Sequence, residues 1–449
     1  MSTPNTFTIE GKGTNRMLRI AGDLPDGFHG ERVDGGYRCP LDARNAQALR
    51  RALPWTAPEL VGKKKSFGYG DRLGIATPGH LRAARTSDMF PVLAQQSIRE
   101  MERARRSAQQ VMDDVTWAVL ESDYRDGFGC DADHVKTPEE IDTCIDAGYV
   151  GFTLDPGQYV NDDAETASTE ELSEELAAFP WDVLHSNPAA HQRYFVSEHG
   201  FSVEDYQRSA VKYGRAVARV AVLNTHIADR FGSNDFDLEV SVDETDTATT
   251  PQQHRYIALE LRRLGIDFIG LAPRFVGHFY KGVDFVGDLD AFDADYAAHA
   301  AVAEELGPYK LSVHSGSDKL SIYPLVNRHT PRYVHVKTSG TSWLEALRII
   351  AEHDAKLFGE ILEMARSGYA TNRRSYHLDG EVDKMPDIGP DAYATLLDDH
   401  HARQVLHVAF GPVLEAFYDD IYAILNERIE DYWNGLEAHF GKHLAPFSG

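Results

Sequence analysis

The chain has few cysteines, no long apolar segment and no surplus of positive charge, and each of these absences excludes a class of protein. Its 449 residues include three cysteines, Cys39, Cys130 and Cys144, without a CxxC spacing. This excludes a disulfide framework and predicts a reduced, cytoplasmic protein. No run of eighteen apolar residues occurs, and the N-terminal MSTPNTFTIEGKG lacks an apolar core. Neither a membrane span nor a signal peptide is therefore predicted.

Acidic residues exceed basic ones by 70 to 45, which gives a formal net charge of −25. A surface field of this sign repels nucleic acid and acidic membranes, so neither is expected as a partner. An anionic small molecule would need a local group of Arg and Lys side chains. Apolar residues make up 42% of the chain, which is enough for the core of a large enzyme.

Nucleotide-binding motifs are also missing. No GxGxxG and no GxxxxGK[ST] follows any strand pattern, which disfavours an open doubly wound sheet and a nicotinamide cofactor. Eight strand patterns do occur, near residues 67, 90, 128, 149, 237, 267, 310 and 333, and most precede a helical pattern. This alternation predicts the α/β class, with a (β/α)8 TIM-type barrel whose active site lies at the carboxyl ends of the strands.

The alternation of strand and helix patterns divides the chain into three parts. Residues 1–66 are predicted to be an N-terminal extension packed on the barrel, with a helix near Asp42 to Arg51. Residues 67–348 form the predicted catalytic barrel, which includes one long helix from about Ser97 to Ser122 and a helical insertion at 161–232. Residues 349–449 form a C-terminal helical region, expected to pack on the outside of the barrel or to form a subunit contact in a homo-oligomer.

Two strand patterns near the end of the predicted barrel carry chemistry-bearing side chains. Ser312 and His314 alternate with apolar residues in the first, and His335 and Lys337 do so in the second. Period two places these polar side chains on one face. A barrel strand that turns His or Lys inward at its carboxyl end is typical of an active-site mouth. A Ser/Gly turn follows each strand, and the repetition favours a functional site over packing.

Polar side chains at other strand ends are expected at the same mouth. They are Asp71, Arg72, Gln95, Asp133, His134, Asp155, Asp243, Glu244 and Arg274. Histidines from three strands, His134, His314 and His335, together with carboxylates favour a divalent metal cation such as Zn, Mn, Ni or Co over Ca or Mg. The alternative is that the imidazoles only hydrogen-bond a polar substrate.

The carboxylates and cations of this set suggest how a sugar is held. Two carboxylates around a sugar can act as proton acceptor and proton donor, and Asp133 with Asp243 or Glu244 offers such a pair. Arg274, Lys281 and Lys337 would counter an anionic group, with Arg giving a bidentate clamp on a carboxylate. Ordinary salt bridges are the alternative for these cations. Asp71, Arg72 and Gln95 complete the predicted substrate-binding set.

Five segments of the chain resemble the tagaturonate epimerase family of bacterial hexuronate metabolism. They are GFGCDADHVKT, VSVDET, LAPRFVG, SVHSGSDKLSIYP and VHVKTSGTSWLEALR, in the family's order. The resemblance spans most of Phe67 to Arg348, but not residues 1–60, the insertion after Val160 or the C-terminal helices. It implies an isomerase that interconverts D-tagaturonate and D-fructuronate with a divalent cation, and whose relatives act on the neutral ketoses tagatose and fructose.

The resemblance also implies roles for particular residues. Asp133 would be the proton acceptor, and His134 and His314 would be metal ligands. Glu244 would be the proton donor, although strand parity points Asp243 further into the barrel, so both stay candidates. The third ligand is assigned to His335 on geometry, with His278 in the GHFYKG loop as its competitor.

The expected chemistry follows from where the two sugars differ. C4 is not adjacent to the C2 ketone, so simple enolisation cannot invert it. Retro-aldol cleavage of the C3–C4 bond, rotation of the aldehyde and recombination would do so. A metal-dependent aldolase that releases the fragments would share nearly all these residues, and a non-catalytic sugar-binding barrel is a further alternative. The choice between a uronate and a neutral ketose substrate is open at this point.

Overall fold

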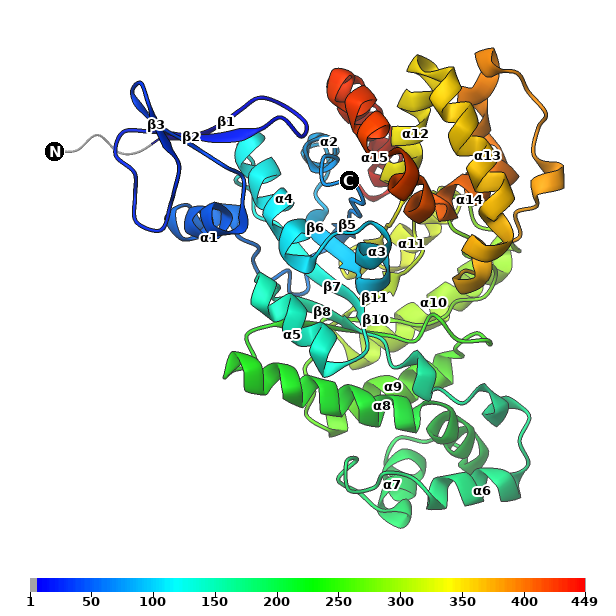
Figure 1. Ribbon diagram of the computed structural model, residues 1–449. Coiled ribbons are helices and arrows are strands. Elements are labelled where there is room, and N and C mark those ends of the chain that lie inside the picture. Colours follow the sequence, from blue (N-terminus) through cyan, green and yellow to red (C-terminus); the bar gives the residue numbers. More distant parts are fainter. Residues whose placement is uncertain (1–5, 449) are drawn as a thin grey trace.

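A closed barrel of eight parallel strands forms the centre of the molecule (Figure 1). The computed structural model describes residues 6–448, so residues 1–5 of the predicted N-terminal extension and Gly449 of the C-terminal region lie outside the described residues. The strands are β5 (Ser66–Gly68), β6 (Phe90–Ser97), β7 (Gly129–Val135), β8 (Gly151–Leu154), β9 (Asp237–Ser241), β10 (Gly270–Ala272), β11 (Lys310–Val313) and β12 (Val334–Lys337). Pairing of β12 with β5 closes the ring. The predicted TIM-type barrel is confirmed.

A helix follows each barrel strand. In chain order these helices are α2 (Thr77–Ala84), α4 (Ala108–Glu121), α5 (Pro138–Ala147), α8 (Val203–Phe231), α9 (Pro251–Arg263), α10 (Leu289–Leu306), α11 (Tyr323–His329) and α12 (Thr341–His353). Several begin at strong start signals. Ser107, Thr137 and Thr250 each form a capping box with the residue three positions on, which satisfies backbone N–H groups of the first turn.

The prediction of a single helix from about Ser97 to Ser122 is wrong. The structure has α3 (Ile98–Arg103) and then α4, separated by Arg105 in the left-handed region at φ 54°. Ser107 restarts the helix as an N-cap that accepts the backbone N–H of Gln110. The apolar periodicity runs through both pieces, so it hid the interruption.

The segment predicted as an insertion contains one helix that belongs to the barrel. The turn η2 (Gly157–Tyr159) precedes the segment, whose first part holds η3 (Asp162–Glu165), α6 (Thr169–Ala177), α7 (Pro188–Arg193) and the π-helical turn η4 (Tyr194–Glu198). In Figure 1, α6 and α7 project from one side of the barrel. The long helix α8 then packs against α5 and α9, its neighbours in the helical ring. It is therefore the crossover helix between β8 and β9.

The N-terminal segment contains a small antiparallel sheet that the sequence patterns did not predict. Its strands are β1 (Thr6–Glu10), β2 (Met17–Ala21), β3 (Glu31–Val33) and β4 (Gly36–Cys39), in the order β1-β2-β4-β3. The predicted helix is present as α1 (Ala43–Ala52), and η1 (Pro54–Thr56) follows it. Leu18, Ile20 and Leu49 pack with Trp117 of α4, which attaches this segment to the barrel.

The C-terminal region is almost wholly helical. It contains α13 (Ala355–Asn372), η5 (Arg373–Ser375), η6 (Val382–Lys384), η7 (Pro390–Asp398), α14 (His400–Val408), α15 (Phe410–Glu427), α16 (Ile429–Leu444) and η8 (Ala445–Phe447). Helix α16 packs on α2, and α15 packs on α3 and α12. None of the helices in residues 6–448 combines the length and the apolar character that crossing a membrane requires.

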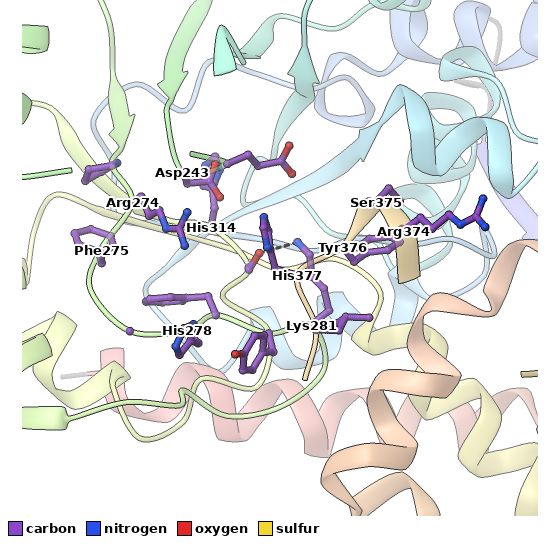
Figure 2. A pocket seen from close by; sticks show the side chains of 17 residues that line it. Asp243, Arg274, Phe275, His278, Lys281, His314, Arg374, Ser375, Tyr376 and His377 are labelled. Carbon is purple, nitrogen blue, oxygen red and sulfur yellow. Dashed lines mark hydrogen bonds and ion pairs between the residues drawn. The ribbon is translucent and has the colours of Figure 1, made fainter. Parts of the chain in front are cut away.

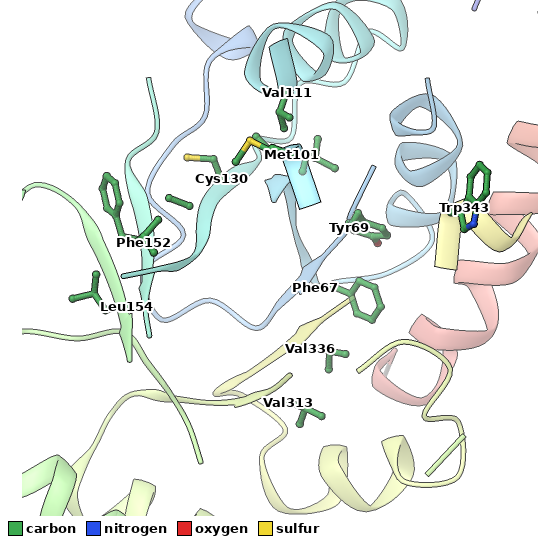
Figure 3. Close-up of a cluster of buried hydrophobic side chains, with 14 of the residues drawn as sticks. Phe67, Tyr69, Met101, Val111, Cys130, Phe152, Leu154, Val313, Val336 and Trp343 are labelled. Atoms are coloured by element: carbon green, nitrogen blue, oxygen red, sulfur yellow. The ribbon is translucent and has the colours of Figure 1, made fainter. Parts of the chain in front are cut away.

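The apolar core lies around the barrel and not inside it. Outward-facing strand residues such as Phe67, Val313 and Val336 join the surrounding helices in one large cluster (Figure 3). Inward-facing positions of a TIM barrel are usually filled by branched apolar side chains. Here many of them are buried polar or charged residues, namely Ser66, Asp131, Thr153, Glu239, Lys310, Ser312, His335 and Lys337. A charged interior requires near-complete internal pairing, which the site described below provides.

We predict that Gly79→Ala destabilises the protein, although Ala favours helices over Gly. A Cβ at Gly79 would lie 2.9 Å from Leu436 Cβ and 3.1 Å from Trp433 Cα, so α16 would have to move away from α2. Overpacking of this kind costs about 1–3 kcal/mol. The matched control is Gly441→Ala within α16, where a new Cβ meets nothing within 4 Å. That change should stabilise by about 0.5–1 kcal/mol. Thermal unfolding measures both, and equal shifts would contradict the packing argument.

Candidate active site

A bulge at the end of β7 brings two adjacent residues to the mouth of the barrel. Strict alternation would point Asp133 and His134 to opposite faces. The pairing of β7 with β8 shifts register between Ala132 and Val135, and His134 has a φ of 53°, in the left-handed region. Both side chains therefore reach the same set of residues. Strained backbone at a non-glycine residue is common at functional sites because the surrounding contacts hold it.

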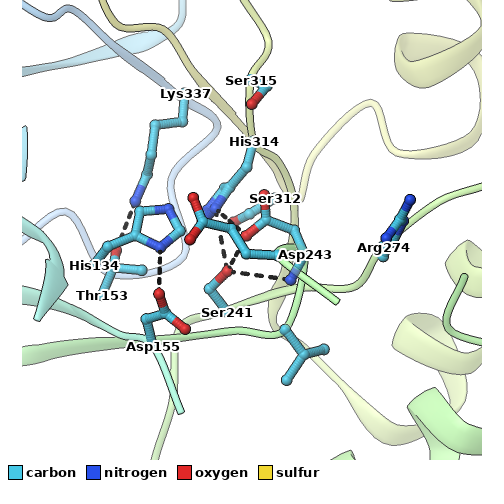
Figure 4. Close-up of polar contacts among 12 residues, drawn as sticks. His134, Thr153, Asp155, Ser241, Asp243, Arg274, Ser312, His314, Ser315 and Lys337 are labelled. Atoms are coloured by element: carbon cyan, nitrogen blue, oxygen red, sulfur yellow. Dashed lines mark hydrogen bonds and ion pairs between the residues drawn. The ribbon is translucent and has the colours of Figure 1, made fainter. Parts of the chain in front are cut away.

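His134 and His314 face one another across the mouth (Figure 4). Their ring centroids are 5.0 Å apart with an interplanar angle of 70°. One ligand atom from each, together with a carboxylate oxygen of Asp243, form a group within 4.8 Å of one another. A second group consists of His134, Asp155 and Glu244. Two imidazoles and a carboxylate at this spacing suit a borderline divalent cation.

Each of these two histidines has a carboxylate behind it. His134 Nδ1 lies 3.3 Å from Asp155 Oδ2, and His314 Nε2 lies 2.7 Å from Glu239 Oε1. A carboxylate that accepts one ring N–H fixes the tautomer and leaves the other ring nitrogen as a ligand. His314 Nδ1 is then the nitrogen that faces Asp243 Oδ1, at 3.2 Å. The donor set therefore fits a metal ion on the arrangement of its own side chains.

The same carboxylates set the protonation of these groups. Burial opposes a charge on His134, but Asp133 and Asp155 outweigh it and raise the pKa of His134 to about 10. Burial likewise opposes charge on Asp155, yet its contacts with His134 and Lys136 lower its pKa to about 2. The site is thus a set of opposite charges that hold one another ionised.

Lys337 lies among carboxylates inside the barrel. Its Nζ is 2.7 Å from Asp131 Oδ2, 2.9 Å from Asp133 Oδ1 and 3.3 Å from Glu239 Oε1. It also donates to Thr153 Oγ1 at 2.7 Å. Burial would lower the pKa of Lys337, but the three carboxylates raise it well above its usual value.

The pKa of Asp133 is shifted in the opposite direction to that of Lys337. Burial would raise its pKa, but Lys337, His134 and His314 hold the pKa well below its ordinary range. Asp133 is therefore a carboxylate. The ammonium of Lys337 faces these acids and also borders a small cavity beside His134, so its predicted role in substrate binding stays a prediction.

His335 does not join the group that could hold an ion. It points into the barrel as predicted, but one layer deeper than Lys337, because it comes two residues earlier on β12. Its Nδ1 lies 2.9 Å from Ser66 Oγ, and burial lowers the pKa of His335 to about 3. Its competitor His278 lies in the loop after β10, where its ring stacks on Tyr280. His278 lines the cavity described below but is in neither candidate ligand group.

Three predicted substrate-binding residues have other partners. Asp71 Oδ1 accepts the backbone N–H groups of Leu73 and Gly74 at 2.9 and 2.8 Å. Arg72 pairs with buried Glu100 and stacks on Phe410, 3.9 Å from the ring centroid. Gln95 Nε2 donates to the carbonyl of Thr338 at 2.8 Å. None of the three lines the cavities at the mouth, and their contacts attach loops and helices to the barrel.

A cavity of about 560 Å³ opens beside the candidate ligands (Figure 2). Asp243, Glu244, Arg274, Lys281 and His314 line it. The guanidinium of Arg274 makes no hydrogen bond or ion pair with residues 6–448, whereas Lys281 Nζ donates to Ser315 Oγ at 2.6 Å. Figure 2 shows both cations beside His314. A cation without a protein partner in a net acidic molecule is available for an anionic ligand.

Several residues of the site escaped sequence reasoning. Glu239 lies on the inward face of β9, so period two could have identified it as a partner of His314, whereas Asp155 was predicted at the mouth but not as a partner of His134. Residues 374–378, in contrast, line the cavity from the C-terminal region, which was expected to pack outside the barrel. No local pattern in RSYHL indicates this, because only the packing of the C-terminal helices brings the segment to the mouth.

Comparison with known proteins identifies the family. A model of the tagaturonate epimerase family matches residues 15–447. The chain belongs to this family. The tagaturonate/fructuronate epimerase of Thermotoga maritima is 35% identical over 460 residues, covering 99% of this chain and 94% of that protein. As a member of the tagaturonate epimerase family, the chain is an enzyme of the isomerase class.

Solved structures of the family have the same fold. The native crystal structure of the fructuronate-tagaturonate epimerase from Cohnella laeviribosi matches with a TM-score of 0.92 and 34% identity. A structure of the same protein with one glycerol matches with a TM-score of 0.91 and 32% identity. Both matches cover 100% of this chain and 94% of the other. The tagaturonate epimerase family fold therefore extends over the N-terminal and C-terminal segments as well as the barrel.

We predict that Arg72→Met lowers stability and leaves the KM of the folded enzyme unchanged. The change leaves Glu100 as a buried carboxylate without its partner, which typically costs about 3–5 kcal/mol. Thermal unfolding and steady-state kinetics below the transition measure the two effects. The double variant Arg72→Met/Glu100→Gln should recover much of the loss. A raised KM with unchanged stability would instead return Arg72 to the substrate site.

Proposed function

We propose that this member of the family is a metal-dependent C4 epimerase that interconverts D-tagaturonate and D-fructuronate. The observation that carries the proposal is the convergence of His134, His314 and Asp243 beside the ionised carboxylate of Asp133. The names of the Thermotoga and Cohnella relatives support the choice of substrates. The open cavity next to this group offers space for a six-carbon sugar acid.

His134, His314 and Asp243 would hold the metal ion, with Asp155 and Glu239 orienting the two imidazoles. When bound, a divalent cation supplies Lewis-acid polarisation of the ketone and neutralises developing negative charge. In this assignment Asp243 is a ligand. Glu244, whose side chain is 36% exposed and borders the same cavity, is then left as the proton donor.

Asp133 acts as the proton acceptor in the proposed retro-aldol route. It takes the proton of the C4 hydroxyl, the C3–C4 bond breaks, and its electron pair stays on the C1–C3 fragment as an enediolate. C4 becomes an aldehyde carbon. After rotation, C3 adds to the other face of the aldehyde, and a proton returned to the C4 oxygen completes the epimer. Lys337 keeps Asp133 ionised before each turnover.

Arg274 is proposed to bind the C6 carboxylate of the uronate. Its guanidinium lines the cavity and has no partner in the described part of the chain. A guanidinium can bind a carboxylate through two parallel N–H bonds, and this contact lies at the end of the sugar remote from the ketone. It therefore distinguishes a sugar acid from tagatose or fructose without touching the reacting bond.

Proton NMR of the purified protein with tagaturonate tests the proposed function. We expect fructuronate to appear, to stop appearing after chelation, and to reappear when Mn, Ni or Zn is restored. Asp133→Asn should lower kcat about 10²–10⁴-fold with metal present, because the acceptor is lost. Glu244→Gln tests the donor in the same assay.

Two outcomes would contradict the proposal. Free three-carbon products in place of the C4 epimer would show that the enzyme is an aldolase. Full activity after removal of all bound metal would exclude the assigned role of His134 and His314. Asp246→Asn, a change in the same loop at a residue outside the cavity lining, is a suitable control for the carboxylate substitutions.

We predict that Arg274→Gln selectively weakens the reaction of uronates. Loss of a charge-assisted bidentate contact of about 1.5–3 kcal/mol should lower kcat/KM for tagaturonate about 10–100-fold. The value for tagatose, if measurable, should change little because that sugar has no carboxylate. Steady-state kinetics on both sugars measure the ratio. Equal losses for the two substrates would remove Arg274 from carboxylate recognition.

A further inference from the structure

A short segment of the C-terminal region crosses the mouth of the barrel. We call residues Arg373–Leu378 the mouth strap; it consists of η5 and the extended residues after it. Figure 2 shows Ser375, Tyr376 and His377 on the cavity side of the strap, opposite the residues that follow β9, β10 and β11. The strap is the part of the C-terminal region that meets the reaction site.

Tyr376 of the mouth strap is attached to the barrel by two arginines of α3. Arg103 Nη1 donates to Tyr376 Oη at 2.9 Å, and Arg103 Nη2 donates to Ser375 Oγ at 3.0 Å. The guanidinium carbons of Arg99 and Arg103 each lie 5.2 Å from the centroid of the Tyr376 ring. The ring is thus held by hydrogen bonds at its hydroxyl and by cations near its face.

The far end of the mouth strap is fixed within the C-terminal region. Arg373 Nη2 donates to the carbonyl of Leu378 at 2.7 Å. Gln404 Oε1 accepts the backbone N–H groups of Asp379 and Gly380, each at 3.1 Å. Tyr369 Oη donates to the carbonyl of Gly380 at 2.9 Å. With contacts at both ends, the strap is a fixed wall of the site.

Tyr376 stands between the reacting groups and the wider opening. It lines the cavity of about 560 Å³ that contains Arg274. It also lines a small inner cavity of about 30 Å³ bordered by Asp133, His134 and Lys337. A molecule that left the inner groups toward the opening would pass the residues that border both cavities, and Tyr376 is one of them.

We propose that the mouth strap retains the aldehyde fragment of the substrate, and that Arg103 is the positioning residue that holds Tyr376 in place for this. The inference rests on the proposed retro-aldol route. Once the C3–C4 bond is broken, no covalent bond holds the C4–C6 fragment. Whether it recombines or leaves then depends on the contact of its carboxylate with Arg274 and on how fast it can diffuse past Tyr376, and this partition separates an epimerase from an aldolase.

The products of escape are defined by the balance of the reaction. The C4–C6 half leaves as 2-hydroxy-3-oxopropanoate, which has already lost the C4 hydroxyl proton. The enediolate half takes up one proton at C3 and leaves as dihydroxyacetone. One hexuronate thus gives one molecule of each, with no net oxidation and no further reactant. A variant whose mouth strap no longer holds Tyr376 in place would therefore have aldolase activity, and its two products would form in equal amounts.

Arg103→Gln tests the retention, with Arg105→Gln as the matched control. Arg103 is absent from both cavity linings, so the change leaves the reacting groups in place. Arg105 lies two residues after Arg103, just beyond the end of α3, but its side chain is 68% exposed and pairs with Glu415 on the surface. The substrate is uniformly ¹³C-labelled tagaturonate, and carbon NMR counts fructuronate, dihydroxyacetone and the aldehyde acid.

We expect Arg103→Gln to raise the released fragments per epimer formed about tenfold or more, because the charge-assisted hydrogen bonds to Tyr376 Oη and Ser375 Oγ are both lost. Arg103→Lys, which keeps the charge on a single donor nitrogen, should restore part of the retention, and Arg105→Gln should match the parent. Tyr376→Phe removes the hydrogen-bonded hydroxyl but keeps the ring and the Arg103–Ser375 contact, and should release fragments in the same direction as Arg103→Gln but to a smaller extent. It provides a second route if Arg103→Gln fails to fold. Lower epimerisation without released fragments in all of these variants would overturn the proposal.

Carbon isotope effects in the parent enzyme distinguish a failure of the retention inference from a failure of the proposed function. Normal ¹³C isotope effects at C3 and C4 report that the bond between them breaks. If they are present while no variant leaks, the retro-aldol route stands and retention by the mouth strap is wrong. If they are absent, the route itself is wrong and the retention inference falls with it.

Discussion

The charged interior of this barrel depends on the contacts between the buried ammonium of Lys337 and three carboxylates. Asp131, Asp133 and Glu239 meet around its Nζ, and a barrel interior with three such acids and no cation would be strongly destabilised. The same contact keeps Asp133 ionised and places Glu239 behind His314. Stability of the interior and protonation of the reacting groups therefore depend on one side chain. This coupling explains why polar residues replace the usual apolar layers of the barrel.

The loop after β11 is held from outside the barrel. Ser315 and Asp318 both have positive φ, at 49° and 62°, so this turn needs support from its surroundings. Arg403 of α14 and His439 of α16 each lie 3.0 Å from Asp318 Oδ1, and His443 Nε2 accepts the backbone N–H of Asp318 at 2.9 Å. Asp318, His439 and His443 also have the spacing of metal ligands. The guanidinium of Arg403 already neutralises the Asp318 carboxylate. Asp318, His439 and His443 therefore connect the C-terminal helices to the loop that carries His314.

The sequence predicted the strands well because each obeys a simple rule. All eight barrel strands lie where period-two alternation and turn residues placed them, and the polar ends of β7, β9 and β11 meet at one mouth as expected. Period-two alternation shows which face a side chain is on but not how far along the barrel axis it lies. His335 and Lys337 were therefore predicted beside His314, although His335 lies deeper in the barrel and the ammonium of Lys337 faces carboxylates. The small N-terminal sheet has short strands with charged residues, for which periodicity is weak. The division at residues 66 and 348 stays a prediction.

What the sequence determined by itself is the barrel and the family, because the barrel follows from local periodicity and the family from motifs that lie within single strands and loops. That Asp133 and His134 both reach the mouth was decided by the bulge at the end of β7. The tertiary structure alone decided which ring nitrogen faces which carboxylate, that Arg72 pairs with Glu100, and that Tyr376 reaches the mouth from the C-terminal region. Those facts depend on the stagger between strands and on the docking of helices far apart in the chain. Such contacts are set by packing across the whole core, and no short segment encodes them.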